Sequence, residues 1–192
     1  MMHLEETLEV EFCKFPYIDL SYILAVVAKM LALYSAFSPS FYIYIDDQKG
    51  RVLHACLFTS LFEKQADGAT WASFIFLLTA WILSAIGAGT ISNFYHVGFG
   101  EREENLPPVS CYLSLWFSLV GTLGLLSLVA LSSETCTSAD ICELSNGAIL
   151  VVIASVLWFT CAFLLCATSF QSRCAIAKVH CDGEEVEQNV RV

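Results

Sequence analysis

The uncharged segment Asn146–Phe170 constrains this chain more than any other stretch of it. It reads NGAILVVIASVLWFTCAFLLCATSF and contains no Asp, Glu, Lys or Arg over 25 residues. A helix rises about 1.5 Å per residue, so this segment is long enough to cross the roughly 30 Å hydrocarbon core of a bilayer. We therefore predict a membrane-spanning helix here.

Three more apolar blocks precede it, and charged residues are scarce within all four blocks. The 192 residues are 57% hydrophobic and 15% charged, whereas a soluble domain carries about 25% charged residues. We predict an all-α membrane protein, a bundle of four transmembrane helices in a domain over 17–170, between an N-terminal tail (1–16) and an acidic C-terminal tail (171–192). No cleavable signal peptide is visible, so the first span is expected to serve as the targeting signal as well. The predicted spans are 17–37, 71–94, 109–131 and 147–170.

The first loop, residues 38–70, contains two β-prone runs around a turn. FYIYI at 41–45 is aromatic and β-branched, DDQKG follows, and RVLHACLF resumes at 51. Such runs around a turn that contains Asp and Gly are typical of a β-hairpin. We predict a small hairpin or sheet from the first loop, outside the membrane.

Four spans place both ends of the chain on one side of the membrane. Basic residues are slightly more frequent in the tails and middle loop than in the other two loops, which favours cytoplasmic termini. Cys136 and Cys142 lie in a polar loop on the opposite side, and a cysteine pair there suits an oxidising space. We expect a multi-pass protein of the plasma membrane rather than of an internal membrane, with cytoplasmic termini.

Three cysteines are candidates for a disulfide on the non-cytoplasmic side: Cys56, Cys136 and Cys142. They can form one pair in three ways. The pair Cys136–Cys142 closes a short local loop, whereas a pair with Cys56 ties the two loops together, and the sequence leaves both open.

On the other side, Cys174 lies close to the fourth span and is a candidate for palmitoylation, with a free surface thiol as the alternative.

Lys29 is a charged residue well inside the first span. A lysine at this depth costs roughly 2.5–3.5 kcal/mol on insertion scales. In the structural interpretation, the Lys29 side chain reaches an interface or a polar seam of the bundle. In the functional interpretation, Lys29 is a buried cation in a pathway or in a seam that binds a partner. Asp19 is too far along the same helix to pair with it, and the other three spans contain no acid.

Two stripes of small or hydroxyl-bearing residues have both a structural and a functional interpretation. Ala80, Ser84 and Ala88 recur every four residues, which allows close helix contact within the bundle or in a homodimer. A second stripe, on the third span, favours packing over a permeation path, because hydroxyls can bond the preceding turn. It consists of Ser114, Ser118 and Thr122.

Charge and motifs exclude several classes of function. The net charge is −10, from 19 acids and 9 bases, so no basic patch is available for nucleic acid. The four histidines are scattered, and no HExxH, CxxC, P-loop or GxSxG pattern occurs. We expect no enzyme, cofactor or metal site, and as partners membrane lipid, other membrane proteins or copies of this chain.

The layout of the whole chain resembles the claudin-like four-helix superfamily, which includes claudins, their epithelial and myelin relatives, and the amastins. The fourth span is similar to the fourth helix of that family in the residues Glu143, Gly147, Ala148, Trp158 and Cys166. The resemblance implies a left-handed four-helix bundle with a small extracellular sheet. The first loop lacks the family's tryptophans and its cysteine pair, so no barrier or pore site is carried over.

These features favour an integral membrane protein that acts by lateral and extracellular protein–protein association. The alternatives are a channel or transporter component, in which Lys29 and the hydroxyl stripe line a polar route, and a small accessory subunit of a larger membrane complex. The chain ends in Val190, Arg191 and Val192, an ending that suits capture by PDZ-type strand addition.

Overall fold

The computed structural model describes residues 16–46, 51–60, 68–96, 106–132, 136 and 141–190, of which residues 171–190 are described by their backbone only. The long helices are α2 (Pro16–Phe37), α4 (Gly68–His96), α5 (Leu106–Leu126) and α7 (Asn146–Val190). A 3₁₀ segment, η3 (Ser127–Ser132), continues α5, and a short helix, α3 (Leu57–Ser60), precedes α4.

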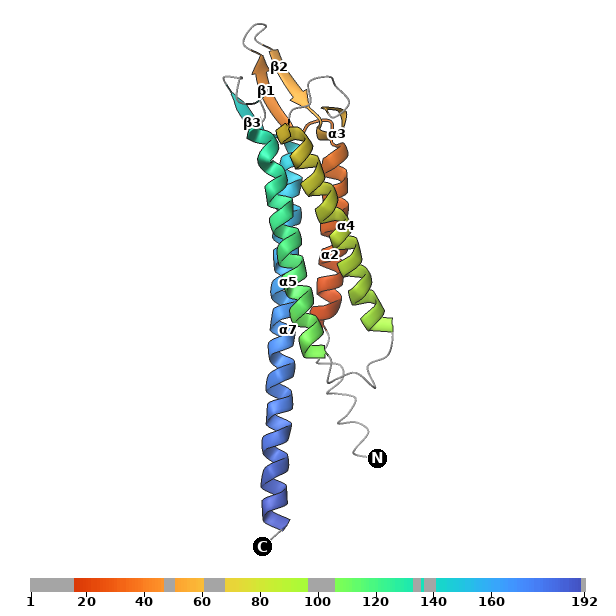
Figure 1. Ribbon diagram of the computed structural model, residues 1–192, viewed down its shortest axis with the longest axis vertical. Helices are drawn as coiled ribbons and strands as arrows, with labels where there is room; N and C mark the ends of the chain where they lie inside the picture. Colours follow the sequence, from red (N-terminus) through yellow and green to blue (C-terminus); the bar gives the residue numbers. More distant parts are fainter. Residues whose placement is uncertain are drawn as a thin grey trace.

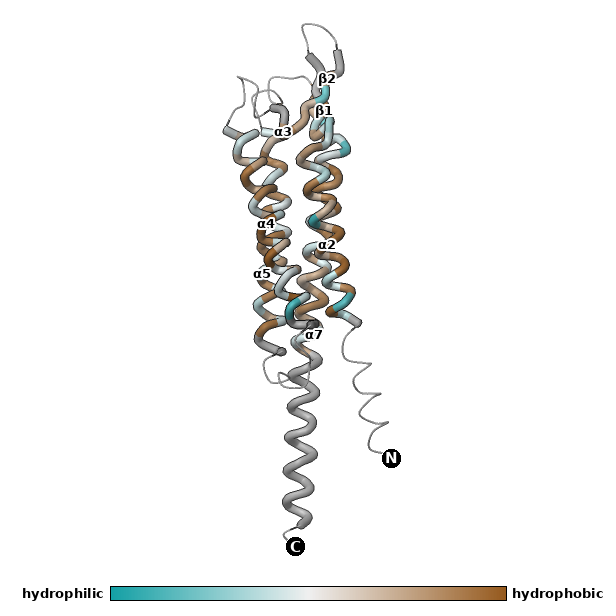
Figure 2. The backbone as a smooth tube through the Cα atoms, turned by 90° about the vertical axis from the view of Figure 1, so that its right-hand side faces the viewer, coloured by the Kyte–Doolittle hydropathy of each residue, from teal (hydrophilic) through white to brown (hydrophobic). Residues whose placement is uncertain are grey.

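Each long helix contains a segment long and apolar enough to cross a membrane. Figure 2 shows the hydrophobic residues along the length of the bundle, with more polar ones gathered at its ends. The prediction of an all-α, four-helix membrane fold is confirmed, and the chain has the architecture of a multi-pass integral membrane protein. The four segments are Tyr17–Phe37, Gly68–Asn93, Val109–Ser132 and Asn146–Phe170.

The helices form a ring in the order α2, α4, α5 and α7. Helix α7 packs most extensively, against α5 on one side and α2 on the other, while α4 makes smaller contacts with α2 and α5. The sheet lies at one end of the bundle, and α7 extends beyond the other helices at the opposite end (Figure 1). The backbone of the predicted C-terminal tail is therefore helical as far as Val190, in a stretch that contains no proline.

Helix α2 turns a stripe of small residues toward the rest of the bundle. Its buried positions alternate in spacing between three and four residues, the repeat that keeps one face of a helix against its neighbours. Because all but one of these side chains are alanine or serine, the neighbouring backbones can approach closely, as small residues allow in lipid. The stripe consists of Ile18, Ser21, Ala25, Ala28, Ala32 and Ser35.

The sheet has three antiparallel strands in the order β2-β1-β3. Strands β1 (Tyr42–Asp46) and β2 (Arg51–Ala55) form the predicted hairpin. The third strand, β3 (Cys142–Leu144), comes from the second loop and pairs with β1, with Tyr42 opposite Leu144. The sheet thus joins both loops, whereas the sequence had predicted it from the first loop alone.

The structure also places the two stripes. Ala80, Ser84 and Ala88 are all buried inside the bundle, so this stripe serves helix packing. Thr122 is exposed, and its hydroxyl donates to the carbonyl oxygen of Ser118 at 2.9 Å within the same helix. The hydrogen of the Thr122 hydroxyl is therefore used within its own helix, as the packing interpretation expects.

Candidate functional site

Backbone contacts under the sheet join the first loop to the start of α7. The amide of Gly147 donates to the carbonyl oxygen of Ser40 at 2.9 Å, and the amide of Ser145 donates to that of Phe41 at 3.2 Å. From α2, the buried hydroxyl of Ser35 donates to the carbonyl oxygen of Gly147 at 2.8 Å. Three segments that are distant in sequence are therefore fixed at one point, which sets the position of the sheet on the bundle.

Gly147 makes this close approach possible. A Cβ atom at this position would lie 2.9 Å from the carbonyl oxygen of Ser40 and 3.0 Å from the Cα of Phe41. Both neighbours are backbone atoms, which cannot move aside by changing rotamer, and the Phe41 side chain is fully buried. A glycine here thus serves a close backbone contact.

A small polar cluster lies beside this junction. The hydroxyls of Ser40 and Ser145 share a short hydrogen bond, and Ser40 Oγ lies 3.0 Å from Nδ1 of His54 on β2. A serine next to a histidine is a possible nucleophile–base pair, but such a pair also needs a group that orients the imidazole. The hydrogen bonds of the described residues supply no such group, and the cluster links β2 to both loops.

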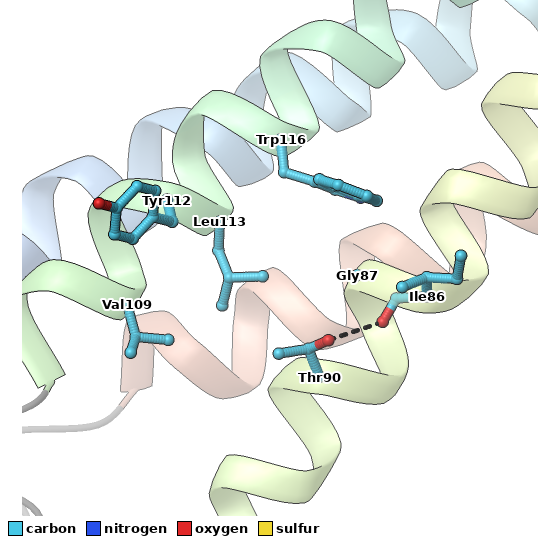
Figure 3. A pocket seen from close by; sticks show the side chains of 7 residues that line it. All are labelled: Ile86, Gly87, Thr90, Val109, Tyr112, Leu113 and Trp116. Atoms are coloured by element: carbon cyan, nitrogen blue, oxygen red, sulfur yellow. Dashed lines mark hydrogen bonds between the residues drawn. The ribbon is translucent and has the colours of Figure 1, made fainter.

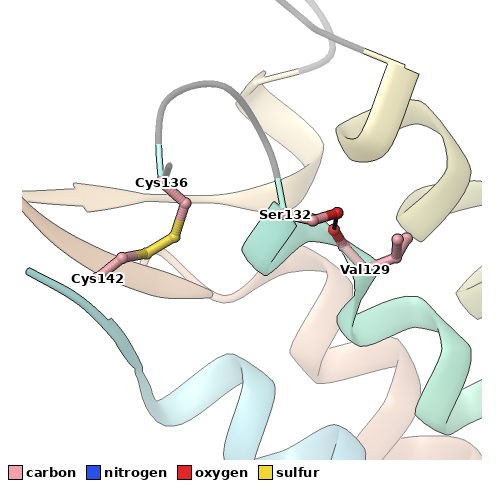
Figure 4. Close-up of a disulfide and its surroundings, with 4 residues drawn as sticks. All are labelled: Val129, Ser132, Cys136 and Cys142. Atoms are coloured by element: carbon pink, nitrogen blue, oxygen red, sulfur yellow. Dashed lines mark hydrogen bonds between the residues drawn. A yellow bond between two sulfur atoms is a disulfide. The ribbon is translucent and has the colours of Figure 1, made fainter. Parts of the chain in front are cut away.

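The disulfide joins Cys136 to Cys142 (Figure 4), with 5.4 Å between their Cα atoms, a usual separation. Of the three pairings left open by the sequence, the structure forms the local one. Cys56, beside α3, is not part of it. The two loops are tied together instead by the pairing of β1 with β3, so the disulfide fixes the strand that makes that connection.

Lys29 lies partly buried on α2, and the contacts of its neighbours show which way it faces. Around the axis of α2, Ser21 and Ser35 lie on one side of Ala25, which is at the centre of the small-residue stripe. Both serines contact α7, Ser21 through Cys161 and Ser35 through Gly147. At 3.6 residues per turn, Lys29 and then Phe37 lie in the other direction. Lys29 is therefore on the flank of α2 that faces away from α7.

The aromatic ring of Phe37 identifies the neighbour on that flank. Its centroid lies 4.8 Å from that of Phe58 on α3, which lies 6.1 Å from that of Phe74 on α4. This cluster of Phe37, Phe58 and Phe74 closes the sheet end of the interface between α2 and α4. Lys29 thus lies at the α2–α4 interface, and the hydroxyl stripe of α5 lies elsewhere in the ring of helices, so the structure does not bring together the two parts of the predicted polar route.

Several buried polar contacts within the bundle were not predicted. Nε1 of Trp158 donates to the hydroxyl of Ser84 at 2.9 Å, with both side chains fully buried. Ser73 on α4 donates to the carbonyl oxygen of Ser127 and accepts from the amide of Ala130 at 2.8 Å, which satisfies backbone groups where α5 becomes a 3₁₀ segment. The only sequence signal for these bonds is a polar side chain within an apolar span.

A cavity of about 230 Å³ lies between α4 and α5 (Figure 3). Its lining is mostly apolar, and the hydroxyl of Thr90 is already bonded to the carbonyl oxygen of Ile86 at 2.9 Å. None of the lining side chains is an acid, a base or a thiol, so the cavity offers hydrocarbon a complementary surface and no reacting group. It is lined by Ile86, Gly87, Thr90, Val109, Tyr112, Leu113 and Trp116.

The remaining predicted residues lie toward the C-terminus. Cys174 is in the part of α7 beyond the fourth span, where only the backbone is described, and Val190 is the last residue of that helix. Arg191 and Val192 lie outside the described residues. The predictions of palmitoylation and of PDZ-type binding stay predictions.

No family model and no curated protein matches this chain. Within the described ranges, no group of three or more His, Cys, Asp or Glu side chains could hold a metal ion. The class of protein therefore rests on the fold, which is that of a four-helix integral membrane protein whose two loops on one side form a sheet, with a disulfide within the second loop.

Proposed function

We propose that this protein acts by association, through contacts of its sheet outside the cell and of its helices within the plasma membrane, as claudin-like proteins do. In this orientation both termini are cytoplasmic and the sheet is extracellular. The Cys136–Cys142 disulfide supports the assignment, because disulfides persist in oxidising compartments. The bundle with its small sheet agrees with the architecture that the claudin resemblance implies.

The observation that carries the proposal is the position of the sheet. Leu53 on β2 and Leu144 on β3 are exposed by 37% and 46% at the end of the molecule that lies beyond the spans. Leu53 is opposite Tyr44 of β1, and Leu144 is opposite Tyr42, two residues before Tyr44. Because side chains two residues apart in a strand point to the same face, Leu53 and Leu144 share one face of the sheet. Because the sheet is fixed to α2 and α7 by hydrogen bonds, these apolar side chains form a rigid surface, and preorganised surfaces lose less entropy on binding.

The test uses copies of the chain as partners. The purified full chain is reconstituted into two populations of vesicles with different dyes, and vesicle tethering is measured by fluorescence cross-correlation. We expect tethering by the wild type and a loss of it for the double variant Leu53→Ser and Leu144→Ser. The matched control is Glu143→Ser, an exposed residue of β3 on the opposite face, which should tether as the wild type does.

Two results would refute the proposal. An absence of tethering by the wild type, or an equal loss for Glu143→Ser, would contradict association through this surface. Placement of the 132–145 segment on the same side as the tails, measured in cells by protease or maleimide access to tagged segments, would contradict the orientation. Flux through wild-type vesicles that changes in Lys29→Leu would instead favour a transport component.

A further inference from the structure

Lys29 lacks a counter-charge within its own bundle. It is the only basic residue of the four membrane-spanning segments, and Asp19 is the only acid in them. Ten residues separate the two along α2, which corresponds to about 15 Å of helix rise. Among the described residues Lys29 forms no ion pair, although charged side chains at this depth are rare and usually paired.

Escape to an interface is also difficult for this side chain. Lys29 is eight residues, about 12 Å, from the sheet end of its span at Phe37 and twelve residues, about 18 Å, from the other end at Tyr17. Side chains leave a helix tilted toward its N-terminus, and for α2 that direction leads to the more distant interface. Snorkelling toward the nearer interface requires the stem to run against this tilt.

A second unsatisfied donor lies on the facing side of the same interface. Nε1 of Trp81 on α4 is buried and has no acceptor within the described part of the chain. Trp81 is two helical turns from Phe74 and on the same face, so it lies on the flank of α4 that faces α2. Phe74 belongs to the aromatic cluster with Phe37, and Trp81 lies about 10 Å below it, close to the depth of Lys29.

The α2–α4 interface is also the less tightly packed side of α2, which contacts α4 less extensively than it contacts α7. Tyr22 and Leu33 lie on the same flank of α2 as Lys29, seven residues before it and four after it, and both are exposed. This flank therefore presents an apolar surface with the ammonium group of Lys29 near the middle of the membrane, beside the buried indole of Trp81. An acceptor for Lys29 must come from another molecule.

We propose that the α2–α4 flank is the docking site for a transmembrane helix of a partner protein that carries an Asp or Glu at mid-membrane depth. The partner's carboxylate accepts from the ammonium group of Lys29. This assignment specifies the lateral part of the proposed function, on which it rests, and does not depend on contacts of the sheet.

A second copy of this chain cannot supply that carboxylate. Copies inserted in the same orientation hold equivalent residues at equal depth, so the Asp19 of one copy lies about 15 Å along the membrane normal from the Lys29 of another. The four spans contain no other acid. The charge of Lys29 thus selects a different protein as its neighbour.

The test measures binding of a synthetic single-span helix to the full chain. A dye-labelled Leu/Ala transmembrane peptide with one central Glu, or the same peptide with Gln, is co-reconstituted with the labelled chain in phosphatidylcholine vesicles, and association is measured by energy transfer. We expect the Glu peptide to bind the wild type roughly three- to twenty-fold more strongly than the Gln peptide, the range of interhelical hydrogen bonds in membranes. In Lys29→Leu the two peptides should bind equally.

The matched control moves the charge round the helix at nearly the same depth. Val27 is 44% exposed and lies on the lipid-facing side of α2, away from both Lys29 and Phe37. The double variant Lys29→Leu and Val27→Lys therefore keeps a lysine in the span but removes it from the α2–α4 flank. We expect this variant to lose the preference for Glu.

The outcomes separate the alternatives. Equal binding of the Glu and Gln peptides to the wild type overturns the proposal, and so does a preference that survives the move of the lysine to position 27. If Lys29 pairs with lipid phosphate instead, anionic lipid binds the wild type better than Lys29→Leu and the Glu peptide gains nothing, which also overturns it. The sheet variants should keep the preference for the Glu peptide even if they lose vesicle tethering. Either proposal, association through the sheet or docking at the α2–α4 flank, can therefore be refuted without the other.

Discussion

Gly147 is the position where a single added methyl group should have the largest effect on this fold. In Gly147→Ala the new Cβ would meet the backbone of Ser40 and Phe41 at 2.9 and 3.0 Å, so the start of α7 must move away from the first loop. That movement strains the hydrogen bonds of Gly147 with Ser40 and with Ser35, which measure 2.9 and 2.8 Å.

The expected loss of unfolding free energy combines the overpacking at Gly147 with the weakening of its hydrogen bonds. Overpacking of a well-filled interior costs about 1–3 kcal/mol, and each weakened hydrogen bond costs about 0.5–1.5 kcal/mol. Since the displacement partly relieves the clash, we expect a total of about 2–4 kcal/mol. The measurement is unfolding of the purified chain by SDS in mixed micelles, followed by far-UV circular dichroism.

Gly89→Ala is the control for this prediction. Gly89 lies on α4, is exposed, and has no atom within 4 Å of the position that an added Cβ would occupy. Alanine in place of a helical glycine gains up to about 1 kcal/mol in intrinsic propensity, so this variant should be as stable as the wild type or more so. If Gly147→Ala unfolds at the same SDS fraction as Gly89→Ala, the close contact at Gly147 does not hold the sheet to the bundle.

Three further changes can be measured in the same titration. Ser84→Ala removes the acceptor of the Trp158 indole and should cost about 0.6–1.7 kcal/mol, with no such effect when Trp158 is already Phe. Cys142→Ser opens the disulfide loop and should cost about 2 kcal/mol; a reductant should lower the stability of the wild type equally and leave the variant unchanged. Gly124→Ala brings a Cβ against Ser155 Oγ and within 2.9 Å of the Trp158 ring, so it should cost about 1–3 kcal/mol, part of which Ser155→Ala should recover.

The sequence predicts those parts of the structure that a bilayer or a local pattern dictates. The span predicted at 17–37 coincides with Tyr17–Phe37, because about twenty apolar residues must stay helical where no water can satisfy the backbone. The hairpin at 41–58 is likewise predictable, since two β-prone runs and their turn are adjacent in the chain. The contact at Gly147 is not, because it depends on Ser40, which is distant in sequence.

The third strand and the position of Lys29 illustrate the same limit. A strand of three residues such as β3 is too short for an alternating pattern, and its partner lies in the other loop. The sequence shows that Lys29 has no acid near it, but only the ring of helices shows which neighbour it faces. The unsatisfied indole of Trp81 was equally hidden, since a tryptophan in an apolar span usually signals packing or an interface.

The two proposed contact surfaces are physically connected through α3. This short helix follows β2 after Cys56 and inserts Phe58 between Phe37 and Phe74, so it closes the sheet end of the α2–α4 flank directly below the strand that carries Leu53. A partner helix in the flank would therefore lie against the support of β2, whereas the junction at Gly147 fixes β1 and β3 independently of that support. Because β2 is also paired with β1 over its whole length and His54 is bonded to Ser40, the sheet holds this strand in place when a helix lies against α3. The two proposed surfaces can therefore be occupied at the same time.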